Sequence, residues 1–198
     1  MTARVESTGK RQDSDVRISS KADYAIRAVV ELATLEDSWP VKAEILAAAQ
    51  DIPGKFLLNI LFELKRAGIV ASQRGNEGGF RLGRAASEIS LADIVRAVEG
   101  PLAQVGDVRP DQLDYKGSAE PLVEVWIAVR EHIRSILESV SVADIATRNI
   151  PLTVRLITAD PEAWMPHTPG TVPGPQAVRV AGQTSRTRGV VTSATRRT

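Results

Sequence analysis

Apolar residues recur at helical spacing over most of the chain. The first such run predicts a helix from Ser20 to about residue 36, with Ser20 and Asp23 spaced as a capping box. A second helix is predicted over 41–50 and a third over 53–67. The residues of these two helices that are expected to face the core are Ile45, Leu46, Ala49, Phe56, Leu57, Ile60, Leu61 and Leu64.

The turn between the second and third predicted helices is only three residues long, from Asp51 to Pro53. Two short helices joined by such a turn form a helix-turn-helix motif, whose second helix enters the major groove of DNA. Lys55 and Asn59 should face outward, four residues apart on one side of that helix. Lys suits O6 and N7 of guanine and Asn suits N6 and N7 of adenine, so both are candidates for reading bases. The alternative is that both are plain surface residues.

The segment after the third helix, 65–84, predicts a β-hairpin, because the strand-like runs IVASQ and FRL flank a glycine-rich turn. Its charged residues are Lys65, Arg66, Arg74, Arg81 and Arg84 against Glu77 alone, so five minus one leaves plus four. A basic hairpin directly after a helix-turn-helix is typical of a wing, which binds the phosphate backbone of DNA. Gly78 and Gly79 should let the backbone approach a phosphate, while Arg74 reaches a narrow minor groove. The alternatives are a solvated hairpin and an Arg74 that only pairs with Glu77.

The second half of the chain is also helical. Ser90 and Asp93 have capping-box spacing and predict a fourth helix that ends at Gly100. After a polar stretch, a long helix should begin near Pro121 with one continuous apolar stripe, and two short helices should follow it. Burial of this stripe against a second copy predicts a twofold homodimer with two recognition helices about one DNA turn apart on a palindrome. The alternative is an intrachain core helix. The stripe consists of Leu122, Val125, Trp126, Val129, Ile133, Ile136, Leu137 and Val140.

Composition excludes several classes of protein. The net charge of the 198 residues is only +1, so affinity for nucleic acid must come from local patches. The chain holds no Cys and two His, which excludes disulfides, cysteine nucleophiles and thiolate metal sites. No recognised nucleophile motif is present, so we expect no enzyme, and no cofactor. Without a signal-like or membrane-spanning apolar run, the protein is expected to be cytoplasmic with no membrane partner.

The predicted fold is therefore mainly α with a small β-hairpin. A winged helix-turn-helix domain (17–100) should be joined by a connecting loop (101–120) to a dimerisation helix and short C-terminal helices (121–160). A disordered N-terminal extension (1–16) and a disordered basic tail (165–198) should flank them, because neither has a repeating apolar face. The tail carries five Arg and no acid, which favours a solubilising role over a non-specific nucleic-acid tether.

Three segments carry a family resemblance: RISSKADYAIRAVVELA, PVKAEILAAAQDIPGKFLLNILFELKRAGIVASQRGNEGGFRLGR and EISLADIVRAVEGPL. Over residues 17 to 147 the chain resembles the Rrf-two family of bacterial winged helix-turn-helix regulators, the family of IscR and NsrR. The resemblance implies a dimeric DNA-binding transcription factor, usually a repressor, that binds double-stranded DNA. It also begins near Arg17, which favours Val16 as an alternative start. The candidate DNA-contacting residues are Lys21, Tyr24, Lys42, Pro53, Lys55, Asn59, Arg74, Gly75, Gly78, Gly79 and Arg81.

The chain departs from the family's cluster-binding members in one respect. Those members place three Cys after the fourth helix, where this sequence has none, so no iron-sulfur cluster is expected. Asp23 matches a position that supplies a carboxylate ligand in some members, but here it is expected to cap the first helix. The loop from Leu102 to Glu120, with Arg109 and Tyr115, is either an effector or partner surface or a plain connector. A winged-helix module that acts through a partner protein remains the alternative function.

Overall fold

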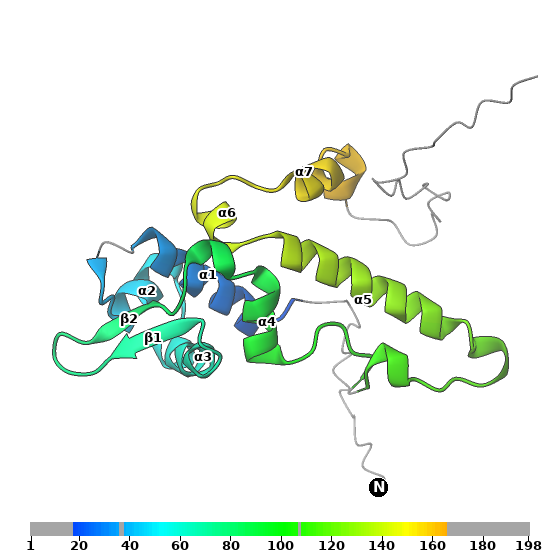
Figure 1. The fold of residues 1–198 in the computed structure, drawn as a ribbon, viewed down its shortest axis with the longest axis horizontal. Helices are drawn as coiled ribbons and strands as arrows, with labels where there is room; N and C mark the ends of the chain where they lie inside the picture. Colours follow the sequence, from blue (N-terminus) through cyan, green and yellow to red (C-terminus); the bar gives the residue numbers. More distant parts are fainter. Residues whose placement is uncertain (1–17, 36–37, 107, 166–198) are drawn as a thin grey trace, which may run out of the picture. The chain divides into compact units, whose positions relative to one another are not determined.

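The computed structural model describes residues 18–35, 38–106 and 108–165 (Figure 1). The predictions for residues 1–16 and for nearly all of the tail lie outside these residues. Residues 18–163 belong to one compact unit. The elements in chain order are α1 Ser20–Thr34, α2 Ala43–Gln50, α3 Gly54–Arg66, β1 Val70–Gln73, β2 Gly79–Leu82, α4 Leu91–Glu99, α5 Leu122–Ser139, α6 Val142–Ala146 and α7 Leu152–Thr158, with short 3-10 turns between them.

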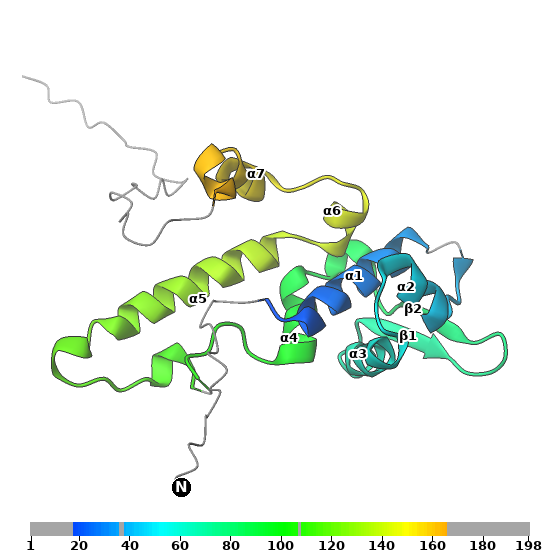
Figure 2. The same cartoon turned by 180° about the vertical axis from the view of Figure 1, so that it is seen from behind.

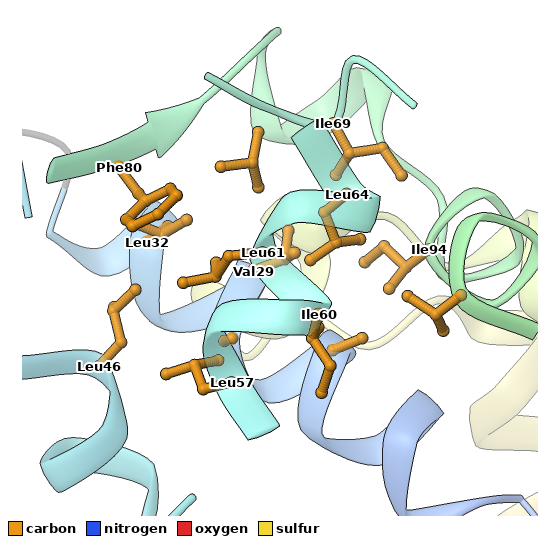
Figure 3. Packing of buried hydrophobic residues seen from close by; sticks show 14 of the residues in the cluster. Val29, Leu32, Leu46, Leu57, Ile60, Leu61, Leu64, Ile69, Phe80 and Ile94 are labelled. Carbon is orange, nitrogen blue, oxygen red and sulfur yellow. The ribbon is translucent and has the colours of Figure 1, made fainter. Parts of the chain in front are cut away.

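Helix α1 is the centre of the packing. It contacts α2, α3, α4, α6 and β2, which surround its apolar side (Figures 1 and 2). Figure 3 shows Val29 of α1 beside Leu61 of α3, and Leu32 of α1 beside Phe80 of β2, among the buried side chains. Each fully buried side chain of this size contributes about 1.5–3 kcal/mol to folding, so this cluster fixes how α3 is held.

Serine side chains cap three of the helices. The hydroxyl of Ser19 accepts a hydrogen bond from the Ala22 amide, so Ser19 and not Ser20 is the N-cap of α1. Asp23 lies in the first turn and pairs with Arg27 at 3.0 Å, so the expectation that Asp23 caps α1 was wrong. The capping box of Ser90 with Asp93 is confirmed at the start of α4. A second capping box begins α6, where the hydrogen bond from the Ser141 hydroxyl holds the pKa of Asp144 below its ordinary value.

Three residues expected in the core are exposed. Ile45 is 52% exposed and Ala49 is also at the surface, because α2 has only eight residues and buries only Ala43 and Leu46. Phe56 is 40% exposed and packs its ring edge-to-face on Tyr24, with 5.8 Å between ring centroids. The other predicted core positions of α3 are all buried.

The predicted hairpin is confirmed. Strands β1 and β2 pair antiparallel, with Val70 opposite Leu82 and Gln73 opposite Gly79. Val41, just before α2, adds a bridge to Phe80 through two backbone hydrogen bonds of 3.0 and 2.8 Å. A Cβ at Gly79 would lie 2.6 Å from the Val41 carbonyl oxygen, so a glycine is needed there for the hairpin to dock on the helix-turn-helix.

Helix α5 buries no residue within the described protomer. Arg96 of α4 binds Glu138 of α5, and the Leu91 amide donates to the Val140 carbonyl, so the end of α5 is attached to α4. Val140 itself is only 4% exposed, because it follows α5 and packs into the protomer's own core. Its prediction as a dimer contact is therefore wrong. Among the described residues no single helix is long and apolar enough to cross a membrane, although the bent pair α2 and α3 together would meet that length and composition.

Candidate nucleic-acid interface

The helix-turn-helix has the geometry that the sequence predicts. The chain bends by 116° between α2 and α3, within the range of about 90–120° for this motif. Asp51 makes the bend in the left-handed conformation, with φ of 50°. Arg27 of α1 donates to the Gln50 carbonyl at 2.9 Å, and the Gln50 side chain donates to Glu31 at 2.7 Å. The C-terminal end of α2 is thus held by α1, which fixes the angle at which α3 is presented.

The outward face of α3 is a stripe of exposed residues along its length. Lys55 and Asn59 are both exposed and have no hydrogen-bond or ion-pair partner within the described residues. Pro53 is the N-cap of α3 and Lys42 is the N-cap of α2; both are exposed, and neither makes a side-chain cap hydrogen bond. Free donors at the start of α3 are what base readout in a major groove requires. The exposed residues of this face of α3 are Lys55, Leu58, Asn59, Phe62 and Arg66.

Two of the candidate DNA-contacting residues, Lys21 and Tyr24, make contacts within the protein instead. The ammonium of Lys21 lies 2.8 Å from the carboxylate of Glu63 and donates to the Val98 carbonyl at 2.6 Å. Tyr24 is half-buried between Phe56 and the guanidinium of Arg27, which lies 4.9 Å from the centre of its ring. These contacts hold α3 against α1, and they argue against a phosphate contact from either side chain.

The wing presents one unengaged arginine. Arg74 is exposed at the end of β1 and forms no ion pair with Glu77 or with any other described residue, so the alternative of a closed Arg74–Glu77 pair does not hold. Gly75 has φ of +112°, and the Gly78 amide donates to its carbonyl at 2.9 Å to close the tip. Gly75 and Gly78 therefore lie at the tip and stay candidate DNA contacts. Gly79 is buried against Val41, next to the Val41–Phe80 bridge, so its prediction as a DNA contact is wrong.

Arg81 of β2 has an aromatic partner that the sequence pattern did not indicate. Its guanidinium lies 5.3 Å from the ring centre of Trp39, a cation–π contact that orients the arginine while leaving it exposed. Arg84 is paired with Asp93 at 3.1 Å. Within residues 65–84 this leaves four cations without a carboxylate partner and one acid, Glu77, so the excess is three positive charges rather than four. The four cations are Lys65, Arg66, Arg74 and Arg81.

Comparison with known proteins decides the family. A family model described as Rrf2, iron-dependent transcriptional regulator, matches residues 18–148, which include the helix-turn-helix, the wing and α5. The chain belongs to the Rrf2 family. It is a DNA-binding transcriptional regulator and not an enzyme, as the resemblance implied.

Several Rrf2 relatives match over most of their length. A protein of Mycobacterium tuberculosis (strain H37Rv), which bears the name of an HTH-type transcriptional regulator, Rv1287, is 45% identical over 73% of this chain and 90% of its own. The solved structure of CymR, titled the global cysteine regulator of B. subtilis, is 30% identical, covers 68% of this chain and 99% of its own, and has a TM-score of 0.58. The structure of T. potens IscR is 28% identical, covers 77% and 94%, and has a TM-score of 0.54.

The iron dependence in the Rrf2 description does not fit the residues of this chain. There is no Cys in its 198 residues, so no thiolate can hold a cluster. Asp23 is paired with Arg27, and no group of three His, Asp or Glu side chains within the described residues could hold a metal ion. In the connecting loop Asp111 is also engaged, since it accepts hydrogen bonds from Arg130 at 2.6 Å and from Arg109. The hydrogen bond from Arg130 holds the pKa of Asp111 below its ordinary value.

Proposed function

We propose that the protein acts as a homodimeric, sequence-specific repressor on a palindromic operator, without an iron-sulfur cluster. The proposal rests on the outward face of α3. Lys55 and Asn59 are exposed there without hydrogen-bond or ion-pair partners among the described residues, and the neighbouring wing exposes Arg74, which is also without such a partner. In this arrangement α3 reads base edges while the wing binds the backbone or the minor groove.

The surface of α5 supports the homodimer. Leu122, Val125, Val129 and Ile136 are exposed along this helix, although each is a large apolar residue. A second copy of α5 would cover these apolar side chains, which are open to water in the isolated protomer. Two copies of α3 would then face one side of the DNA about one helical turn apart.

Repression follows from where such a dimer would bind. A protein that fills two successive major grooves excludes polymerase from the promoter that contains the operator, with no further contact needed. No step of this proposal requires a metal ion or a cofactor. Iron and acid-labile sulfide analysis of anaerobically purified protein tests that part, and stoichiometric iron with charge-transfer absorption would overturn it.

The proposal is tested by DNA binding to the promoter of the protein's own gene. Full-length protein is titrated into the labelled duplex with an excess of unlabelled non-specific DNA, and binding is followed by mobility shift. Specific binding that survives the competitor is the expected result. Loss of all binding under competition, together with a protein that co-purifies with the chain, would contradict it and favour a module that acts through a partner.

A further inference from the structure

The recognition helix exposes apolar side chains as well as donors. Leu58 is 37% exposed and Phe62 is 52% exposed, one helical turn apart on the side of α3 that faces away from the core. The opposite side of the helix already buries its full set of apolar residues, Leu57, Ile60, Leu61 and Leu64. Packing within the protomer therefore does not explain why positions 58 and 62 are apolar.

The position of these side chains places them among the candidate base-reading residues. With about 100° of rotation per residue, Leu58 and Asn59 flank the line that runs from Lys55 through Phe62 to Arg66. Leu58 also lies in the N-terminal half of α3, the part of a recognition helix that approaches base edges most closely. An α3 docked through Lys55 and Asn59 brings Leu58 and Phe62 to the same groove.

The chemistry of the major groove offers one apolar group to such side chains, the 5-methyl group of thymine. The other base edges present donors and acceptors, which an apolar side chain would desolvate without a partner. The cations on either side, Lys55 and Arg66, suit a polyanion and not an apolar protein surface. We propose that Leu58, with Phe62 beside it, determines specificity by contacting thymine methyl groups in the major groove. This inference rests on the proposed sequence-specific binding.

The test removes the methyl group without changing any hydrogen bond. An operator is first selected from a random DNA pool with the full-length protein. Each thymine is then replaced by deoxyuridine in both half-sites together, and the affinity is measured by fluorescence anisotropy at fixed salt. At one or two positions of each half-site, we expect the loss of the methyl group to weaken binding about fourfold per methyl, the factor for one buried methyl-sized group.

Three variants link this loss to the side chain. Leu58→Ala should bind the thymine and deoxyuridine operators with equal affinity at the affected position, whereas Leu58→Met should retain the preference for thymine. Leu156→Ala is the matched control, because Leu156 is an exposed leucine of α7 outside the winged helix-turn-helix, and it should also keep the preference.

The outcomes separate this inference from the function on which it rests. Failure to select any sequence from the pool would overturn both. A selected operator that wild-type protein binds equally with thymine or deoxyuridine at every position would overturn the role of Leu58 and Phe62 while leaving specific binding intact. The role would be overturned equally if Leu58→Ala kept the full preference for thymine.

Discussion

Lys21 and Glu63 form a salt bridge of 2.8 Å that joins α1 to the recognition helix, and the same ammonium donates to the Val98 carbonyl of α4 at 2.6 Å. One side chain thus holds three helices at the base of the interface. Because a hydrogen bond to a charged group is worth more than an exposed ion pair, Lys21→Met should lower the free energy of unfolding by about 1–2 kcal/mol. Chemical denaturation measures this change.

Lys42→Met is the control for Lys21, because Lys42 is exposed and has no such partners within the described residues. It should change the free energy of unfolding by less than about 0.5 kcal/mol. If Lys21→Met instead left stability unchanged and reduced the salt dependence of DNA binding, Lys21 would be a phosphate contact after all.

Gly79→Ala should lower stability, since its Cβ would lie 2.6 Å from the carbonyl oxygen and 2.8 Å from the carbonyl carbon of Val41. Moving one backbone segment to make room should cost about 1–3 kcal/mol, as overpacking in a core does. Thermal unfolding followed by circular dichroism gives the change. Gly54→Ala is matched to it, because a Cβ at Gly54 meets nothing within 4 Å. Equal stability of the two variants would show that the Val41 bridge is not needed.

Arg74→Ala should flatten the dependence of log affinity on log salt by about one unit per protomer, or about two per dimer, because each phosphate-directed charge releases about one counterion. The loss should be largest where the minor groove is narrow and rich in A·T pairs. Arg84→Ala should change the salt slope less, since Arg84 is paired with Asp93. An unchanged affinity and slope for Arg74→Ala on the selected operator would make the wing purely structural.

Trp126→Asp should weaken the proposed homodimer by several kcal/mol, because it places a charge in an apolar contact between two copies of α5. Sedimentation velocity at several concentrations measures the dissociation. Glu131→Ala is a suitable control, as Glu131 is an exposed and charged residue of the same helix. A wild-type chain that sediments as a stable monomer would refute the dimer itself.

The features that were predicted correctly depend on residues close together in the sequence. The hairpin follows from two strand-like runs around a glycine-rich turn, and the start of α4 follows from Ser90 and Asp93 three residues apart. The buried side of α3 follows from apolar residues at helical spacing. In each case the local pattern and the final packing agree, so the pattern was sufficient.

The features that were missed depend on partners far away in the sequence. Lys21 carries the charge of a DNA contact, and only the fold brings it to Glu63 and Val98. Ser19 and Ser20 are both able to cap a helix, and it is Ser19 that caps α1, where its hydroxyl also donates to Glu99 at the end of α4 at 2.6 Å. Val140 continues the apolar stripe of α5 but turns into the core where the helix ends. No sequence pattern predicted the cation–π contact between Arg81 and Trp39.

Lys55 and Asn59, the exposed donors of α3, should read bases, and this is tested by comparing the affinity of Asn59→Ala for operator DNA with its affinity for scrambled DNA. Asn59→Ala and Lys55→Ala are each titrated into both duplexes at one salt concentration, and binding is followed by fluorescence anisotropy. Each variant should lose about 1–3 kcal/mol on the operator, the worth of one bidentate base contact, and keep its affinity for the scrambled duplex. Equal losses on both duplexes, or no loss on the operator, would show that Lys55 and Asn59 do not read bases.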